Sequence, residues 1–179
     1  MEFSFKTINS LIGLVLVAFL INAVMSFKFG DPKEVIITKP KSYVSVENVD
    51  RQLDCLAMNI YKEAGHEPFE GKVAVAQVTL NRVDNPKFPK DICAVVYQKN
   101  VVMEKVVCQF SWHCEGSATK KPKDKAYQES YAVAKKVLLE GFRLDSLSDA
   151  LYFHAVYVNP AWPHEKIGRI GNHVFYKGR

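Results

Sequence analysis

Several short signatures that identify common protein classes are missing from this sequence. It has no Cys-x-x-Cys pair and no His-Glu-x-x-His segment, so the usual zinc-site spacings are absent. No run of basic residues is interleaved with aromatic residues, and no helix-turn-helix spacing appears, which argues against a nucleic-acid-binding protein. Internal repeats and low-complexity tracts are also lacking. These absences leave an ordinary globular domain as the expected class.

The composition is that of a globular protein with a modest positive charge. Hydrophobic residues make up 48% and charged residues 24% of the 179 residues, which argues against disorder, collagen and a coiled coil. The 24 lysines and arginines exceed the 19 aspartates and glutamates, for a formal net charge of +5. Such a charge suits an anionic surface, whether nucleic acid, phospholipid or bacterial wall polymer, but it is too small to choose among them.

Residues 8–25 form an uncharged, mostly apolar stretch near the N-terminus. Eighteen residues are just enough to span a bilayer, so the stretch could be a signal anchor. The apolar run at residues 11–21 has the length of a signal-peptide core, and Val24-Met25-Ser26 offers a small-residue cleavage site. A buried core helix is the third reading. The first two imply export, either to the outer face of the membrane or into the medium.

Composition divides the chain into three parts. We expect a signal anchor or signal peptide at residues 1–26 and one folded domain at residues 49–179. Residues 27–48 lie between them and contain two prolines and four lysines, which is typical of a linker.

Helical periodicity marks the first part of the domain. Asp50 is a suitable N-cap, apolar residues recur at helical spacing as far as Ala64, and Gly65 follows where helices often end. Pro68 suits the first position of a second helix that should reach about Arg82. Two further helices are expected at residues 90–98 and 124–140.

The last part of the domain changes character. The segments "ALYFHAVYV" and "GNHVFYKG" are rich in aromatic and β-branched residues, so they predict two strands, with "NPAWPHEKIGRI" between them. The segment "CQFSWHCEG" shows no helical period and is expected to be extended. The fold class that follows is α+β: a helical part and a small C-terminal antiparallel sheet, preceded by an N-terminal apolar helix.

All four cysteines lie in the domain that follows the apolar stretch. An even number of cysteines in an exported chain predicts two disulfides, with three possible pairings. We expect Cys93 to pair with Cys108 or Cys114, which leaves Cys55 for the remaining cysteine.

Glu63 is the most unusual residue of the first predicted helix. It shares a helical face with Leu56 and Ile60, and it lies near the C-terminal end of that helix. Partial burial and the negative end of the helix dipole both favour a protonated carboxyl group. A raised pKa is what a general acid for glycosidic cleavage requires. The competing interpretation is a surface glutamate paired with Lys62 or Lys72.

Five blocks of the sequence together resemble a known family. They are "LDCLAMNIYKEAGHEPFEGKVAVAQVTLNRV", "FPKDICAVVYQ", "CQFSWHCEG", "ALYFHAVYVNPAW" and "IGNHVFY". In this order they are similar to the successive blocks of the SleB/CwlJ cell wall hydrolases. The resemblance implies a lysozyme-like, transglycosylase-related fold that acts on peptidoglycan without a cofactor.

The same resemblance implies that the glutamate of the Tyr-x-Glu-Ala block is the catalytic acid. Tyr61, Glu63 and Ala64 match this block. The family commonly continues Arg-Gly-Glu, whereas this chain has Gly65 and His66 before the glutamate.

Candidate substrate-binding residues are spread over the later blocks. Gln109 and Ser111 could hydrogen-bond sugar hydroxyl or N-acetyl groups. Strand alternation gives each of the two late strand histidines a defined direction, and nearby aromatic rings could stack on sugars. The candidates are Tyr61, Gln109, Ser111, His154, Trp162, His173 and Tyr176.

A hydrolase with paired carboxylates needs a second acidic residue, for which Glu67, Glu70 and Glu115 are the candidates. A lytic transglycosylase needs only one, so we predict cleavage between N-acetylmuramic acid and N-acetylglucosamine with Glu63 as acid and base. The expected partners are peptidoglycan and, through the apolar stretch, a membrane.

Two alternatives remain open. A zinc amidase could use His66, His154 and His173 as ligands with Glu63 as base. A non-catalytic wall-binding module is the other.

Overall fold

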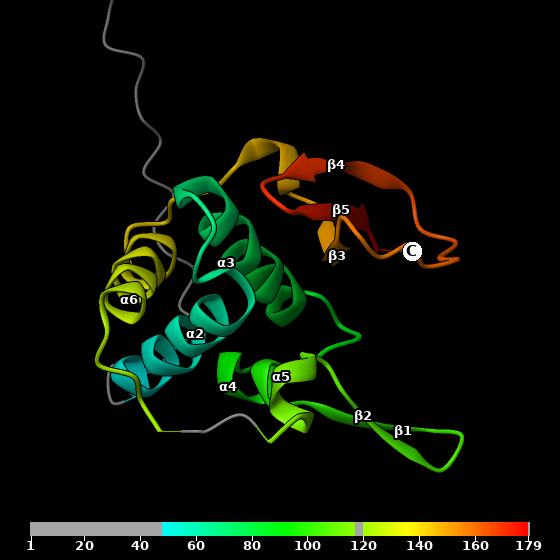
Figure 1. Cartoon of the computed structure of the whole chain (residues 1–179), viewed down its shortest axis with the longest axis horizontal. Coiled ribbons are helices and arrows are strands. Elements are labelled where there is room, and N and C mark those ends of the chain that lie inside the picture. Colours follow the sequence, from blue (N-terminus) through cyan, green and yellow to red (C-terminus); the bar gives the residue numbers. More distant parts are fainter. Residues whose placement is uncertain (1–47, 117–119, 179) are drawn as a thin grey trace, which may run out of the picture. The chain divides into compact units, whose positions relative to one another are not determined.

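The computed structural model describes residues 48–116 and 120–178 (Figure 1). The expected apolar segment at residues 1–26, and all of the expected linker except residue 48, lie outside these ranges. Within the described ranges, every helix is too short or too polar to cross a bilayer.

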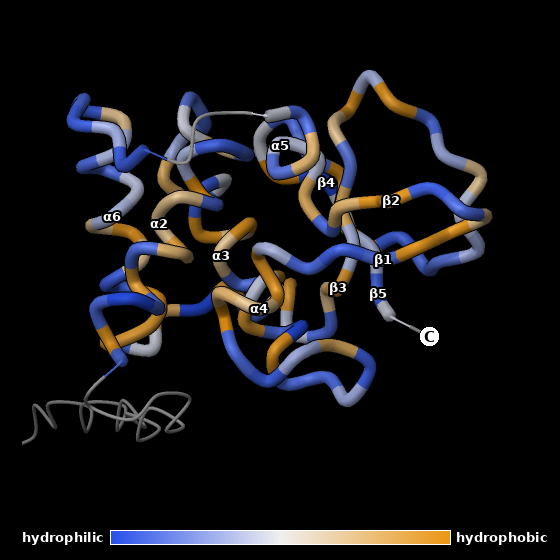
Figure 2. The backbone as a smooth tube through the Cα atoms, turned by 90° about the horizontal axis from the view of Figure 1, so that it is seen from below, coloured by the Kyte–Doolittle hydropathy of each residue, from blue (hydrophilic) through white to orange (hydrophobic). Residues whose placement is uncertain are grey.

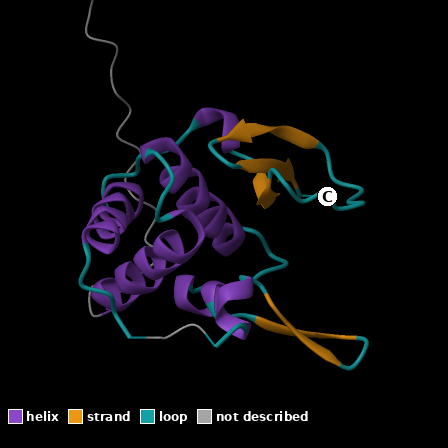
Figure 3. Cartoon of the chain, in the orientation of Figure 1, coloured by secondary structure: helices purple, strands orange, loops and turns teal. Residues whose placement is uncertain are grey.

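The described chain runs from helices to a small sheet (Figure 3). The helices are α2 (Val49–Ala64), α3 (Phe69–Asp84), α4 (Ile92–Val96), α5 (Ser111–Cys114) and α6 (Lys125–Leu138), with a 3-10 turn η2 at Asp145–Leu147. The strands are β1 (Lys99–Val102), β2 (Lys105–Cys108), β3 (Ala150–Ala155), β4 (Lys166–Ile170) and β5 (His173–Lys177). β1 and β2 form a hairpin, and the other strands form an antiparallel sheet in the order β3-β5-β4. The predicted α+β class is confirmed for this part of the chain.

Helix α3 lies at the centre of the fold because it is apolar on two sides. Val73 and Leu80 join the core that α3 forms with α2, α4 and α6. Ala74 and Val78 pack instead with Phe175 of β5 in a second core beneath the sheet. Helix α3 therefore lies between the other helices and the sheet, and it positions both.

The predicted helix boundaries are close but differ at the turn between α2 and α3. Gly65 keeps right-handed backbone angles, with φ −57°, and its N–H donates to the Tyr61 carbonyl. It therefore extends the helical path by one residue and does not reverse the chain as a left-handed glycine would. Pro68 is the N-cap residue of α3, so this helix begins at Phe69, one residue later than expected.

Three elements were missed by the sequence patterns. The hairpin of β1 and β2 is exposed along its length, so it lacks the alternation of apolar and polar residues that marks a half-buried strand. Helix α5 is a single turn, too short for a helical period, and it replaces the expected extended segment. Strand β4 follows a proline-rich loop and contains Gly168, both of which argue against a strand.

Two disulfides are present, as predicted, but the expected pairing was wrong. Cys93 pairs with Cys55, and Cys108 pairs with Cys114. The reason is the packing of α4 on α2, which brings Cys93 against the start of the first helix. The second bond joins residues only 6 apart and links the base of the hairpin to α5.

We expect the two disulfides to contribute unequally to stability. The Cys55–Cys93 bond closes a separation of 38 residues and the other bond a separation of 6. Chain entropy then assigns about 4 kcal/mol to the first and about 2 kcal/mol to the second. Urea unfolding of Cys55→Ala/Cys93→Ala should show the larger loss of unfolding free energy, with Cys108→Ala/Cys114→Ala as the matched control. An equal or reversed order would contradict this assignment.

Candidate active site

Glu63 lies two residues before Gly65, in the last turn of α2, and lines a cavity of about 430 Å³. The walls of this cavity come from the α2–α3 turn, the end of β3 and the turn between β4 and β5. Ala155, Asn172 and His173 contribute from the sheet side. The glutamate thus occupies a recess between the helical layer and the sheet, where a polymer could reach it.

The carboxyl group of Glu63 keeps a substantial protonated fraction near neutral pH. Burial raises its pKa to about 7; Arg82 lowers it in part, and the negative charge of Glu115 raises it further. Within the described residues the carboxyl group has no hydrogen-bond or ion-pair partner. The alternative pairing with Lys72 is not formed, because Lys72 donates to Glu129 at 3.0 Å. Such a free, protonated carboxyl group can donate a proton to a bound molecule.

Arg82 is a buried cation that sequence patterns did not single out. Its Nε donates to the carbonyl of Leu151 at 2.9 Å, and its guanidinium lies 4.9 Å from the ring centre of Phe110. Burial lowers the pKa of Arg82 to about 10, which leaves it charged at neutral pH. The only signal for Arg82 in the sequence was a basic residue within the apolar pattern of the second predicted helix. Arg82 fixes the start of β3 against the end of α3 and places a positive charge near Glu63.

Helix α5 is anchored to α2 beneath the site. The indole N–H of Trp112 donates to the Asn59 side chain at 3.0 Å, and Asn59 in turn donates to Thr79 at 3.2 Å. Both Asn59 and Trp112 are buried. This buried network holds α5 so that Glu115, which follows it, acts electrostatically on Glu63. These buried polar groups are hydrogen-bonded to one another, which favours a single arrangement of α5 on α2.

Glu67 ties the sheet to the turn that carries Glu63. One carboxylate oxygen accepts the backbone N–H of Asn172 at 3.1 Å, and the other accepts its side-chain amide at 2.9 Å. Gly171 approaches so closely that a Cβ there would lie 1.9 Å from the Glu67 carboxylate. Glu67 was considered a possible second carboxylate, but both of its oxygens are engaged. It positions the β4–β5 turn at the edge of the cavity.

The two strand histidines lie on opposite faces of the sheet. His173 shares a face with Phe153 and Phe175, is buried, and lines the Glu63 cavity. His154 lies on the other face, where its ring accepts or donates a hydrogen bond with the Tyr176 hydroxyl at 2.9 Å. The predicted alternation in each strand is confirmed. The register places the two histidines on opposite sides of the sheet, so His173 lines this cavity and His154 faces away from it, beside Trp162.

Of the remaining sequence candidates, Tyr61 borders the Glu63 cavity and the others lie away from it. Tyr61 lines the cavity and donates through its hydroxyl to Asp124, the N-cap residue of α6, at 2.8 Å. Trp162 contacts the rings of His154 and Tyr176 on the far face of the sheet. Gln109 and Ser111 flank the start of α5 and do not line the cavity.

The ligand set of the zinc alternative is not assembled. His66 and His173 border the cavity, but His154 faces away from it. In residues 48–116 and 120–178, no group of three histidine, cysteine, aspartate or glutamate side chains is placed to hold a metal ion.

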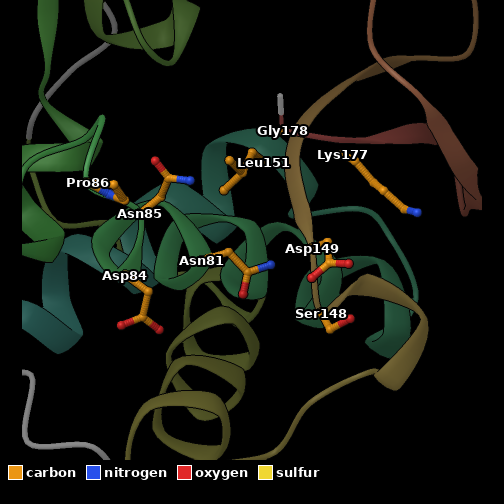
Figure 4. Close-up of a pocket in the computed structure, with 9 residues that line it drawn as sticks. All are labelled: Asn81, Asp84, Asn85, Pro86, Ser148, Asp149, Leu151, Lys177 and Gly178. Atoms are coloured by element: carbon orange, nitrogen blue, oxygen red, sulfur yellow. The ribbon is translucent and has the colours of Figure 1, made fainter.

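A second cavity of about 480 Å³ lies where the end of α3 meets the strand β3 and the C-terminal residues (Figure 4). Its polar groups are already used by the fold. Asn81 donates to the carbonyls of Leu147 and Ala150, and Lys177 pairs with Glu165 at 2.7 Å. None of the sequence-predicted site residues lines it. The cavity beside Glu63 is therefore the better candidate for chemistry.

Comparison with known proteins gives consistent matches. The sequence model of the cell wall hydrolase family matches residues 66–176, a range that begins just after Glu63. The spore cortex-lytic enzyme of Bacillus subtilis (strain 168) is 30% identical over 128 residues, which are 67% of this chain and 35% of that enzyme. The corresponding enzyme of Oceanobacillus iheyensis is 30% identical over 133 residues, 70% of this chain and 41% of the enzyme. The chain spans less than half the length of these curated relatives.

Two solved structures have the same fold. The catalytic domain of the Bacillus cereus SleB protein has a TM-score of 0.56 at 24% identity, over 76% of this chain and 98% of that domain. The catalytic domain of the germination-specific lytic transglycosylase SleB from Bacillus anthracis has a TM-score of 0.55 at 26% identity, over 75% of this chain and 100% of that domain. The mixture of helices and small antiparallel sheets is thus shared.

Gly171→Ala should break the link between Glu67 and Asn172. The new methyl group would displace the Glu67 carboxylate, and φ of +57° already disfavours any side chain there. We expect a loss of about 2–4 kcal/mol of unfolding free energy. Gly141→Ala is the matched control, because Gly141 has φ +73° but open space around the added Cβ. It should lose only about 1 kcal/mol in the same urea titration. Equal losses in the two variants would show that Glu67 does not matter to stability.

Glu63→Gln should stabilise the protein at alkaline pH. The pKa of Glu63 rises from 4.5 to about 7 on folding, so wild-type stability falls as pH rises through this window and is constant above it. A glutamine cannot ionise and avoids that loss. Because the carboxyl group partly faces the open cavity, we expect a gain of about 1–2 kcal/mol at pH 8 relative to pH 4. Thermal unfolding at both pH values measures this, and a pH-independent difference would refute the raised pKa.

Proposed function

The chain belongs to the cell wall hydrolase family, and we propose that it cleaves peptidoglycan glycan strands as a lytic transglycosylase. The bond cut would be the one between N-acetylmuramic acid and N-acetylglucosamine. The observation that carries this proposal is the unpaired carboxyl group of Glu63, with a pKa of about 7, in an open cavity between the helices and the sheet. The description of the Bacillus anthracis structure as a lytic transglycosylase supports the same reaction.

In the proposed reaction Glu63 acts first as an acid and then as a base. Its carboxyl group donates a proton to the glycosidic oxygen, and the bond to C1 of the muramoyl sugar breaks with the electron pair leaving on that oxygen. The C6 hydroxyl of the same sugar then attacks C1, and the Glu63 carboxylate accepts the hydroxyl proton. The products are a free N-acetylglucosamine end and a 1,6-anhydromuramoyl end, and Glu63 is again protonated.

The environment of Glu63 suits both halves of this cycle. Burial supports the protonated form that begins the reaction, whereas Arg82 stabilises the carboxylate that exists after the proton is donated. A pKa near 7 lies close to the pH at which donation and acceptance are both favourable. No second carboxylate is required, which agrees with the engagement of both Glu67 oxygens by Asn172.

Other residues are proposed to hold the glycan. Tyr61 and His173 border the cavity and would contact the sugars on either side of the cleaved bond. The remaining candidates lie away from the cavity, and we propose that they contact more distant parts of the strand. They are Gln109, Ser111, His154, Trp162 and Tyr176.

Export is part of the proposal because peptidoglycan lies outside the plasma membrane. The two disulfides support an oxidising compartment. We propose that the chain acts at the outer face of the membrane, or in the medium if residues 1–26 are removed.

Digestion of purified peptidoglycan by the full chain, followed by mass spectrometry, tests the reaction. We expect 1,6-anhydromuramoyl ends, with or without a chelator, at a rate that falls as pH rises above about 7 because Glu63 loses its proton. Glu63→Gln should lower the rate by about 100-fold or more. Glu70→Gln is the matched control, since Glu70 is an exposed glutamate in the first turn of α3, and it should keep the wild-type rate.

Each other outcome points to a different function. Reducing muramoyl ends would indicate hydrolysis, with Glu115 as the first candidate for the second carboxylate; Glu115→Gln would then abolish activity. Free stem peptides that disappear with chelator would identify an amidase. Binding without any cleavage would indicate a wall-binding module.

A further inference from the structure

The hairpin of β1 and β2 carries the most exposed apolar side chains of the described chain. It extends away from the helices and from the other sheet (Figure 1), and its hydrophobic stretches stand apart from the core (Figure 2). Val101 is 74% exposed, Met103 at the tip is 92% exposed and Val106 is 60% exposed. Such a cluster on a projecting element usually marks an interaction surface.

Both faces of this hairpin carry exposed apolar side chains. The register pairs Val101 with Val106, so these two side chains lie on one face. Val102 and Val107 alternate with them and therefore lie on the other face, where both are also exposed. A protein that docked against one face would leave the other in water. A medium into which the tip inserts would cover both.

The charged residues of the hairpin indicate which medium would cover its tip. Lys99 stands at the base of the hairpin and Lys105 follows the turn, while Glu104 is the only acidic residue of the two strands and their turn. Apolar tips flanked by lysines match the interface of an anionic bilayer, where acyl chains take up the apolar groups and phosphates meet the ammonium groups. We propose that this hairpin inserts into the surface of an anionic phospholipid membrane.

The hairpin is already shaped for insertion. Met103 and Glu104 form its turn with φ of 49° and 65°, a left-handed conformation that normally favours asparagine or glycine. The sequence keeps a large apolar side chain at the tip despite this conformational preference. The Cys108–Cys114 bond fixes the base of β2 to α5, which limits bending between the hairpin and the domain.

Weak insertion is enough if the domain is already near a membrane. The sequence-based expectation of an anchor at residues 1–26 supplies that condition, because such an anchor would keep the domain beside the bilayer. The tethered hairpin would then meet the bilayer at a high effective concentration. Insertion would orient the domain on the membrane, a role separate from the proposed cleavage of glycan.

Fluorescence quenching by brominated lipids tests insertion directly. The full chain carrying Met103→Trp is reconstituted into phosphatidylcholine vesicles with about one third phosphatidylglycerol. We expect its added indole to be quenched at least about twofold more than that of Leu139→Trp, with the background of the two native tryptophans subtracted. Leu139 is the matched control because it is an exposed apolar residue at the C-terminal end of α6. This helix lies on the opposite side of the helical part from the hairpin (Figure 1).

Two further measurements make the result decisive. Lys99→Gln/Lys105→Gln, or vesicles without phosphatidylglycerol, should reduce the quenching of the Met103→Trp protein. Equal quenching of the two tryptophan variants would overturn the proposal. Shielding of the tip that depends on protein concentration and persists in neutral vesicles would also overturn it, in favour of a second copy of the chain. Glycan cleavage by Met103→Trp should remain at the wild-type rate, so a failure of insertion and a failure of the proposed reaction are distinguishable.

Discussion

The bond between the Glu67 carboxylate and Asn172 joins the two layers of the domain at the point where the candidate chemistry lies. Glu67 belongs to the turn that follows Glu63, and Asn172 precedes the strand that carries His173. The cavity exists because this contact holds the β4–β5 turn beside the end of α2. The Glu67 carboxylate therefore helps to set the distance between Glu63 and the opposite wall, and the close approach of Gly171 shows how little freedom that contact has.

Electrostatic balance at Glu63 follows from the same packing. Burial against the cores raises the pKa, and it outweighs the opposing effect of Arg82, whose charge is also committed to Leu151 and to the ring of Phe110. Lys72 could have neutralised the carboxylate, but Glu129 on α6 engages it. The site therefore keeps one cation near enough to stabilise the Glu63 carboxylate, yet too weakly coupled to return the pKa of Glu63 to its ordinary value.

Local patterns in the sequence predicted the features that depend on neighbours along the chain. The α+β class, the long helices and the alternation of His173 with Val174 all follow from periodicity and were confirmed. Contacts between distant segments could not be read in this way. The partner of Cys93 depends on the docking of α4 onto α2, and the separation of His154 from His173 depends on strand register. Arg82 was missed because its partners lie in distant segments of the chain. The hairpin was missed because it has no buried face and so no alternation of apolar and polar residues.

The Cys55–Cys93 bond has a consequence for when the domain becomes stable. It joins the first helix to α4 across the core, and disulfides persist only where the surroundings are oxidising. Before it reaches such surroundings, the chain must hold α4 against α2 by noncovalent contacts alone, namely the apolar core and the hydrogen bonds from the Ile92 and Cys93 N–H groups to the Gln52 side chain. Full rigidity, and with it the fixed placement of Glu63, is thus acquired only in an oxidising compartment. Under the proposed export, this couples maturation to the compartment in which peptidoglycan lies.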